Sequence, residues 1–287
     1  MTAIAPEILE TAQWGTVLKV SRKELKGTVS SRWFWMWVVA FVALAAVLVL
    51  VALPGSRIEG QAGFGRSAAS LVTLVQIIIP LMGLALGAMS IAGQRESGAL
   101  RFLMSHPISR TEAFWGIYLG NAAVLAIASG AGFGVAGLIT TVRGFSGDAT
   151  AFIWIAAVSW ILSVAMLGVG MLISTFAGRS SAALGVAVFV WLVFVFIGDL
   201  GLMGTAAATQ MPVSALFMTA LLNPVEAFRL TALTAFSGSL DALGPAGTFA
   251  VDTLGDWLGI VLLVVLLIWL VVPALFAWRR FAGKTDL

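Results

Sequence analysis

Residues 94–118 decide the fold, and they read QRESGALRFLMSHPISRTEAFWGIY. This polar, arginine-bearing segment lies between two long apolar stretches of the chain. Almost all of the remaining sequence is hydrophobic enough to lie inside a membrane. The segment is therefore the one place on its side that is long and varied enough for another protein to grip. This arrangement predicts a membrane subunit worked by a partner, and not a self-sufficient enzyme.

The composition indicates an integral membrane protein. Of the 287 residues, 60% are hydrophobic and 10% are charged, whereas soluble domains carry about 25% charged residues. No shift in composition marks a separate soluble domain, so we predict one membrane domain. Cysteine is absent, which excludes disulfides, thiol nucleophiles and thiolate metal sites. The net charge of +3 does not indicate a nucleic-acid partner, because the basic residues gather beside the predicted membrane spans.

Six stretches are long enough to cross the apolar core of a bilayer, which takes about 20 residues. The predicted spans cover residues 33–53, 71–92, 114–142, 151–176, 182–203 and 257–278. They form a single membrane domain, 33–278, between an N-terminal segment, 1–32, and a tail, 279–287. The predicted fold is an all-α integral membrane protein with six transmembrane helices, a hinge at 94–113 and an outer loop with short helices at 204–256. An even number of spans places both termini on one side.

The basic residues predict which side that is, since loops rich in lysine and arginine stay in the cytoplasm. The terminal segments and the two loops on their side hold twelve of the sixteen: Lys19, Arg22, Lys23, Lys26, Arg32, Arg95, Arg101, Arg110, Arg179, Arg279, Arg280 and Lys284. The other face holds four: Arg57, Arg66, Arg143 and Arg229. We therefore predict that both termini of this multi-pass cell-membrane protein are cytoplasmic.

An amphipathic helix is predicted just before the first span. Trp14, Leu18, Ser21 and Leu25 recur at helical spacing with Val17 alongside, and basic residues take the opposite face. A basic helix of this kind lies in the membrane interface, with its lysines near anionic lipid headgroups. Two interpretations stay open: an orientation signal, or an elbow that transmits motion to the first span.

The hinge carries its own helix signals. Residues 109–112 read SRTE directly after Pro107, a capping-box pattern that predicts the start of the third span's helix at Arg110. Upstream, residues 96–105 predict a short amphipathic helix that presents three apolar residues on one face: Leu100, Leu103 and Met104. A helix held by short connections at both ends moves only with the spans, as a mechanical coupling element must. A passive loop is the alternative.

The predicted spans carry little ionic chemistry. No lysine or arginine lies well inside any span, and Asp199 is the one acid embedded in a span. Proton- and ion-coupled transporters depend on ionisable residues inside the membrane, so an autonomous secondary transporter is disfavoured. Glycines recur four residues apart, a spacing that lets helices approach closely: Gly83 with Gly87, and Gly116 with Gly120. Two polar residues of the spans are expected to hydrogen-bond between helices: Gln76 and Asn121.

A short helix is predicted in the outer loop. Asn223 suits its N-cap, Pro224 suits its first position, and Glu226 completes a reciprocal cap three residues on. Glu226 and Arg229 can pair at helical spacing, and Asp199 at the outer end of the fifth span is an alternative partner for Arg229. Two interpretations of this helix stay open: a lid that seals the bundle, and a site for cargo or for a partner protein.

The motifs that the sequence lacks favour a membrane subunit over an enzyme. No Gly-x-x-x-x-Gly-Lys sequence occurs, so the chain lacks this nucleotide-binding loop and any ATP must be hydrolysed by a separate chain. The single histidine, His106, lies in the hinge, where it cannot serve a protease or a multi-histidine metal site in the membrane. Asp199 has no second buried aspartate with which to form an aspartyl-protease pair. We therefore expect no catalytic residue, no metal site and no cofactor on this chain.

One motif of the hinge consists of Glu96, Ser97, Gly98, Ala99 and Leu100, followed by Leu103, Ser105, Pro107, Ile108, Ser109 and Arg110. With this motif between its second and third spans, the chain resembles the permeases of the ABC-2 type transporter family. That family commonly has threonine in place of Ala99 and often leucine in place of Met104. The resemblance extends over the whole chain, from the N-terminal elbow to the long outer loop before the last span.

This resemblance implies a permease that acts as a homodimer with two copies of a separate ATPase, which binds the ATP and the Mg. The elbow and the hinge would contact that ATPase, and the translocation path would lie between the two copies, lined by the second and fifth spans. The implied coupling residues are Glu96, Ser97, Gly98, Leu100, Leu103, Pro107, Ser109 and Arg110.

Asp199 and the run NPVEAFRL at residues 223–230 carry a narrower resemblance, to the permeases that serve nitrous-oxide reductase maturation and copper processing. It implies a role in supplying sulfur or copper, with an extracytoplasmic partner at the outer face. The residues implied there are Asp199, Asn223, Pro224, Glu226 and Arg229. Two alternatives stay open: a generic ABC-2 exporter of a lipid, drug or peptide, and a scaffold that relays ATPase motion to an outer protein and transports nothing.

Overall fold

A computed structural model describes residues 13–59, 61–142, 149–208, 213–234 and 244–283. The described chain is helical and runs in this order: α1 (Trp14–Val29), α2 (Arg32–Glu59), α3 (Gln61–Glu96), α4 (Ala99–Met104), α5 (Arg110–Val142), α6 (Ala149–Phe176), α7 (Ser180–Ala208), α8 (Val213–Leu222), α9 (Pro224–Leu233), α10 (Gly244–Leu254), the 3-10 turn η3 (Gly255–Trp257) and α11 (Leu258–Gly283).

Five helices are long and apolar enough, over their described residues, to cross a membrane: Arg32–Leu50, Val72–Glu96, Arg110–Val142, Phe152–Phe176 and Leu258–Gly283. They correspond to the first four predicted spans and the sixth. The predicted fifth span lies on α7, where the apolar stretch found among the described residues, Ser180–Phe196, is shorter. The predicted all-α fold is confirmed for this part of the chain, and its five candidate spans are consistent with a membrane protein. The sixth crossing and the side on which the termini lie stay predictions.

The helices extend beyond the predicted spans. α2 continues to Glu59 and α3 begins at Gln61, so most of the connection expected at residues 54–70 is helical. A helix satisfies its backbone N–H and C=O groups internally, as segments that enter the apolar core of a membrane must. In the outer segment, 204–256, the structure adds α8, α9 and α10 to the end of α7.

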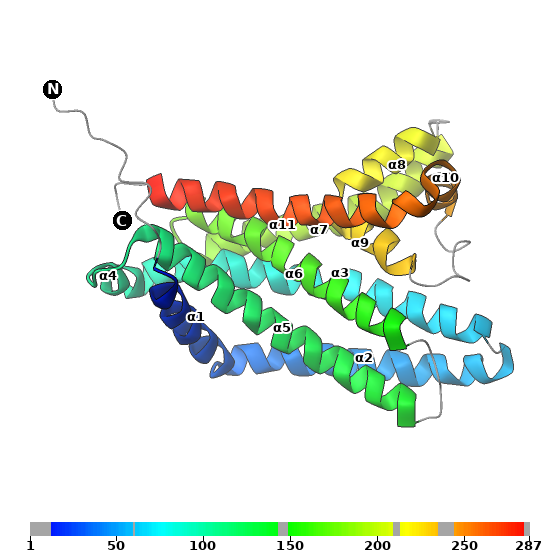
Figure 1. The fold of residues 1–287 in the computed structure, drawn as a ribbon, viewed down its shortest axis with the longest axis horizontal. Helices are drawn as coiled ribbons and strands as arrows, with labels where there is room; N and C mark the ends of the chain where they lie inside the picture. The colour runs from blue at the N-terminus through cyan, green and yellow to red at the C-terminus, as the bar shows by residue number, and fades with distance from the viewer. Residues whose placement is uncertain (1–12, 60, 143–148, 209–212, 235–243, 284–287) are drawn as a thin grey trace.

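α3 and α6 share the most extensive interface and form the centre of the bundle. Around them, α11 packs on α6, α2 packs on α3 and α5, and α7 packs on α3. One end of the bundle carries α1, α4 and the C-terminal end of α11, while α8, α9 and α10 lie at the opposite end (Figure 1). The hinge and the outer segment are therefore separated by the full length of the spans.

Glycines explain why α3 and α6 lie so close together. A Cβ atom at Gly87 would collide with the backbone of Leu167 and Met171, and one at Gly170 would collide with the backbone of Leu84 and Ala88. Lipid tails are as apolar as leucine, so membrane helices are held together by close packing and hydrogen bonds more than by escape from water. These glycines let the two backbones touch.

A hydroxyl group strengthens the same interface. Ser174 of α6 donates from Oγ to the carbonyl oxygen of Ala88 at 2.6 Å and accepts the backbone N–H of Ala92 at 2.8 Å. The hydroxyl thus lies between two backbone groups of α3 that are one helical turn apart. This contact fixes the axial register of α6 against α3 near the hinge end.

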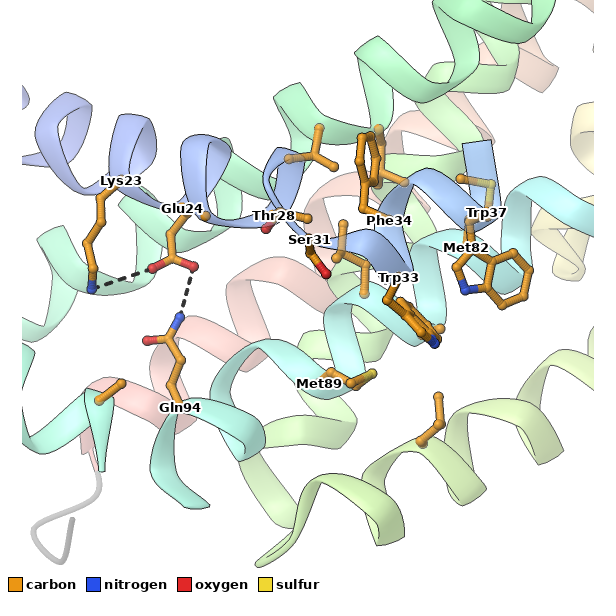
Figure 2. Close-up of a pocket in the computed structure, with 17 residues that line it drawn as sticks. Lys23, Glu24, Thr28, Ser31, Trp33, Phe34, Trp37, Met82, Met89 and Gln94 are labelled. Carbon is orange, nitrogen blue, oxygen red and sulfur yellow. Dashed lines mark hydrogen bonds and ion pairs between the residues drawn. The ribbon is translucent and has the colours of Figure 1, made fainter. Parts of the chain in front are cut away.

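A cavity of about 660 Å³ lies beside α1. Its walls come from the α1–α2 junction, α3, the start of α4, α5 and the first turns of α7 (Figure 2). One end is polar, with Lys23, Glu24 and Gln94, and the other is lined by aromatic and apolar side chains that include Trp37 and Met82.

The glycine contact yields a stability prediction. Gly87→Ala should lower the free energy of unfolding by about 1–3 kcal/mol, because the added methyl group overpacks a backbone contact. Gly130→Ala is the matched control, since no atom lies within 4 Å of a Cβ built there, and alanine there should raise stability by up to about 1 kcal/mol. Thermal unfolding of both variants in detergent measures the difference; equal melting temperatures would contradict the assigned role of Gly87.

Candidate functional site

The hinge forms a short helix between two turns, at the same end of the bundle as α1. After Glu96 the backbone reverses at Gly98, whose φ of 75° is a left-handed conformation that glycine adopts without strain. α4 follows and buries Leu100 and Leu103 in the apolar cluster that also contains Phe114. The helix predicted over residues 96–105 thus exists but spans only Ala99–Met104.

The outer surface of α4 carries an aromatic side chain that the sequence pattern did not single out. Phe102 is 68% exposed, and its ring meets the exposed His106 edge to face with centroids 5.1 Å apart. Arg101 is exposed beside it. Aromatic residues and arginine are enriched where proteins bind each other. The sequence could have predicted this exposure. Phe102 is apolar, but at helical spacing it lies on a different face of α4 from Leu100 and Leu103.

The last two residues of α3 hold the turn between α6 and α7. Arg95 Nη1 donates to the carbonyl oxygen of Ala177, at the C-terminal end of α6, at 3.0 Å. The Glu96 carboxylate accepts from the hydroxyl of Ser180, the first residue of α7, and from its backbone N–H at 3.0 Å. A cation at a helix C-terminus and an anion at a helix N-terminus both complement the helix dipole. Glu96, a predicted coupling residue, therefore joins the hinge to α7.

The predicted capping box at the start of α5 is confirmed. The Ser109 N–H donates to Glu112 Oε2 at 2.8 Å, the Glu112 N–H donates to Ser109 Oγ at 3.2 Å, and α5 begins at Arg110. The second carboxylate oxygen has a partner that the sequence did not predict. Glu112 Oε1 accepts the backbone N–H of Gln13 at 2.8 Å, immediately before α1. Glu112 is buried, so one carboxylate ties the starts of two helices together.

The elbow helix α1 forms as predicted, with one buried edge and one exposed apolar edge. Val17 and Val20 turn inward and are buried, whereas Trp14 is 72% and Leu18 53% exposed. The reason is the surface of α5, where α1 lies against two glycines that leave no room for a Cβ atom: Gly116 and Gly120. The edge of α1 with Val17 and Val20 thus packs on α5, and the apolar edge with Trp14 and Leu18 stays on the surface of the chain.

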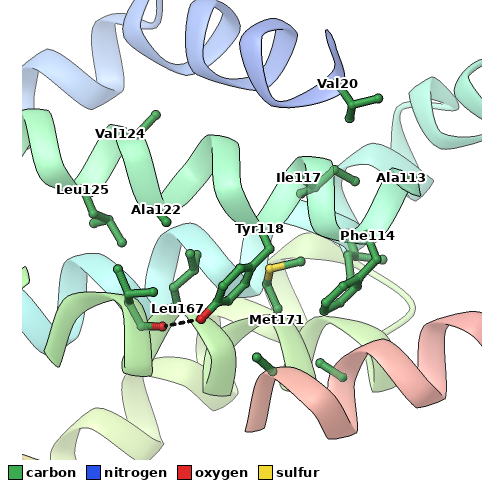
Figure 3. Packing of buried hydrophobic residues seen from close by; sticks show 14 of the residues in the cluster. Val20, Ala113, Phe114, Ile117, Tyr118, Ala122, Val124, Leu125, Leu167 and Met171 are labelled. Atoms are coloured by element: carbon green, nitrogen blue, oxygen red, sulfur yellow. Dashed lines mark hydrogen bonds between the residues drawn. The ribbon is translucent and has the colours of Figure 1, made fainter. Parts of the chain in front are cut away.

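An apolar cluster connects these elements inside the bundle. Phe114 and Tyr118 of α5 lie beside Met171 of α6 (Figure 3), and the rings of Phe114 and Phe281 of α11 have centroids 5.9 Å apart. The end of α11 also meets α6, because the Arg280 guanidinium carbon lies 3.5 Å from the centroid of the Phe176 ring. α1, α4, α5, α6 and α11 therefore meet at the hinge end of the molecule.

Glu24 adds a third carboxylate at this end. Its Oε2 accepts from Gln94 Nε2 at 3.0 Å, and its Oε1 lies 3.9 Å from Lys23 Nζ. Burial raises the pKa of the Glu24 carboxyl above its ordinary value, while Lys23 and the Gln94 amide act in the opposite direction. Glu24 thus holds α1 to the end of α3 at the edge of the cavity.

At the opposite end, α9 is inserted among the spans. The side chain of Asn223 caps it by accepting the Val225 N–H at 2.9 Å, and Pro224 occupies its first position, as predicted. The predicted reciprocal cap from Glu226 does not form, because the Asn223 N–H donates to the Ala220 carbonyl at 3.1 Å instead. Asn223 Nδ2 also donates to the Phe194 carbonyl of α7 at 2.7 Å, which anchors the start of α9 to that helix.

Glu226, which the sequence placed on a short helix outside the predicted spans, is buried. Its Oε1 accepts from Gln76 Nε2 of α3 at 3.3 Å, which confirms an interhelical bond for Gln76, and its Oε2 lies 3.7 Å from Arg229 Nη1. Tertiary folding therefore buries Glu226 in the bundle, although the sequence analysis found Asp199 as the one acid within a span. Asp199 lies on α7, and its side chain falls outside the described residues, so its predicted pairing with Arg229 stays a prediction.

Comparison with known proteins identifies the class. Residues 18–287 match the family described as ABC-2 family transporter protein, and the chain belongs to this family of multi-pass membrane permeases. It is similar to the probable ABC transporter permease protein NosY of Stutzerimonas stutzeri, with 30% identity over 281 residues, which cover 93% of this chain and 98% of that protein. The probable ABC transporter permease protein NosY of Pseudomonas aeruginosa is 30% identical over 234 residues, 78% of this chain and 83% of that protein.

Glu112 should be more important for α1 than the rest of the capping box. Glu112→Gln replaces one acceptor oxygen by an amide, so a backbone N–H loses its charged partner, and we expect a loss of about 1–3 kcal/mol. Ser109→Ala removes only the cap on α5, which is worth about 1 kcal/mol. Hydrogen exchange should quicken at α1 in the first variant and stay unchanged there in the second. Equal protection of α1 in both would disprove the link through Gln13.

Glu24 should make stability depend on pH. Because its folded-state pKa lies above the unfolded value, its stabilising contribution is complete below the unfolded pKa, about 4.5, and is lost as the pH rises through the folded pKa. Glu24→Gln, which keeps an acceptor for Gln94, should therefore melt above the wild type at pH 8, with a gap that narrows toward pH 4.5. The exposed Asp252 provides the control variant Asp252→Asn. A gap independent of pH would refute the assignment.

Proposed function

We propose that this chain is the membrane subunit of an ABC-2 type transporter in the inner membrane, with six crossings and both termini in the cytoplasm. α1, α4 and the C-terminal end of α11 lie at one end of the bundle (Figure 1), which fits an even number of crossings. α7 has 29 residues, or about 43 Å at 1.5 Å per residue, so it is long enough to be the sixth. The distribution of basic residues supports a cytoplasmic hinge.

We propose further that two copies of the chain work with two copies of a separate ATPase, which binds ATP and Mg, while this chain contributes no cofactor site. The observation that carries this proposal is the way α4 is held. Phe102 and Arg101 face outward for a partner, while Glu96 joins the hinge to α7 and Glu112 joins it to α1. A push on α4 is therefore transmitted to several helices at once.

The cargo is a narrower proposal. The similarity to two NosY permeases supports a role in nitrous-oxide reductase maturation, through copper or sulfur supply, with an outer partner protein. The partner or gate site would comprise Asp199, Asn223, Pro224, Glu226 and Arg229. Within it, Asn223 and Glu226 hold α9 in the bundle, and the Arg229 side chain, 35% exposed, is the part offered outward. A generic exporter of a lipid, drug or peptide and a non-transporting scaffold are the alternatives.

The coupling proposal is tested on α4. Phe102→Ala should weaken ATPase binding at least tenfold, since truncating an interface aromatic commonly costs about 2 kcal/mol or more. The permease should still reach the membrane in normal amount, because the side chain is exposed. Phe276→Ala, which truncates an exposed phenylalanine of α11 (58%), is the control and should bind normally. Copurification and ATPase stimulation are the readouts, and normal coupling in the Phe102 variant would refute the proposal.

The three cargo alternatives are separated by what copurifies and by flux. Mass spectrometry of the complex gently extracted from native membranes should find the ATPase in each case. An outer protein of the nitrous-oxide reductase system would favour the maturation role. Cross-linking the spans should abolish cargo flux in a transporter, whereas a scaffold has no flux to lose. Absence of any ATPase would overturn the whole proposal.

A further inference from the structure

The lining of the cavity beside α1 contains none of the coupling or outer-site residues assigned above, and its chemistry indicates a ligand. Its volume of about 660 Å³ falls within the range of about 300–1,000 Å³ that is typical of ligand pockets. Two of its lining side chains are exposed, Trp33 at 41% and Met89 at 37%, so the cavity reaches the surface of the chain. We propose that it binds one phospholipid with an amine headgroup, of the phosphatidylethanolamine class, from the leaflet in which α1 lies.

Two buried polar atoms of the cavity lining need partners. The indole Nε1 of Trp37 has no acceptor, and the amide Oε1 of Gln94 has no donor, although both atoms are buried. Polar atoms withdrawn from water without a hydrogen bond are costly. A ligand that offers an acceptor to Trp37 and a donor to Gln94 satisfies both atoms.

The polar end of the cavity matches a zwitterion. Lys23 Nζ lies 3.9 Å from Glu24 Oε1, and Gln94 turns its unpartnered oxygen to the same end, since its Nε2 is bonded to Glu24 (Figure 2). An ammonium group of the lipid can donate to Gln94 Oε1 beside the Glu24 carboxylate, while the phosphate lies toward Lys23. A trimethylammonium headgroup has no N–H to donate. A glycerol headgroup has donors, but it leaves its negative charge uncompensated beside Glu24.

The other end of the cavity matches an acyl chain. Its lining is apolar and aromatic: Phe34, Met82, Ala85, Leu86, Val124 and Leu125. Trp37 lies at this apolar end of the cavity (Figure 2) and follows the start of α2 at Arg32 by five residues, or about 7–8 Å at 1.5 Å per residue. Tryptophan N–H groups favour this headgroup level of a membrane. The Trp37 N–H can therefore donate to an acyl ester oxygen of the lipid, below the headgroup.

The test compares lipids that differ in one property. The full chain, extracted in mild detergent and stripped of lipid, is titrated by native mass spectrometry with dioleoylphosphatidylethanolamine, with its N-trimethyl analogue dioleoylphosphatidylcholine, and with dioleoylphosphatidylglycerol. The amine lipid should bind at one per chain, and about three- to tenfold more tightly than the trimethyl analogue, as the loss of one hydrogen bond predicts.

Trp37→Phe keeps the ring and removes the donor, so it should weaken binding of the amine lipid about three- to tenfold. Trp257→Phe alters an exposed tryptophan outside the cavity lining and is the control. A second variant tests the site independently, should the Trp37 variant fold poorly. Leu86→Trp fills the cavity from a half-buried position and should abolish the single tight lipid site.

Three outcomes would overturn the proposal. The first is equal affinity for the amine lipid and its trimethyl analogue, and the second is tighter binding of the glycerol lipid. The third is a saturating shell of many lipids per chain that Leu86→Trp leaves intact, which is the behaviour of unspecific lipid around any span. Retention of one amine lipid per chain from native membranes, lost in the Leu86 variant, would support it.

Discussion

Backbone contact between α3 and α6 is the constraint on which the rest of the structure depends. It is possible only where Gly87 and Gly170 leave out a side chain, and Ser174 then fixes the axial register of the two helices by bonding to three backbone groups of α3. Because this contact lies near the hinge end, it brings the last turn of α3 within reach of the α6–α7 turn. The bonds of Arg95 and Glu96 follow from that proximity.

The hinge end of the molecule is held by carboxylates that accept hydrogen bonds from N–H and O–H groups of neighbouring elements. Glu96 binds the start of α7, and Glu112 binds the residue before α1 and the start of α5. Charge-assisted bonds are short and directional, so the helices they join move together. Leu100 and Leu103 fix α4 to the apolar cluster beneath it, while Phe102 on its outer surface stays exposed.

The opposite end follows a different design, in which a helix of the outer segment closes the bundle. α9 is buried along all of its length except Arg229, and polar bonds from Asn223 and Glu226 join it to α7 and α3. An acid buried in this way is stable only with partners, which gives Gln76 and Arg229 a structural reason to lie beside it. The hinge end thus presents the exposed Phe102, the opposite end holds the buried Glu226 and Gln76, and long helices join the two ends.

The sequence by itself determined the membrane class, the positions of most spans, the capping box at Ser109 and the N-cap at Asn223. Each of these depends on composition or on hydrogen bonds within about four residues, so each can be predicted from a short stretch of sequence. Only the tertiary structure decided the orientation of α1, the exposure of Phe102, the burial of Glu226 and the contact of Glu96 with Ser180, 84 residues away. In a membrane protein an apolar residue can face lipid or protein, and periodicity cannot distinguish the two. Glycine contacts between distant helices make that choice.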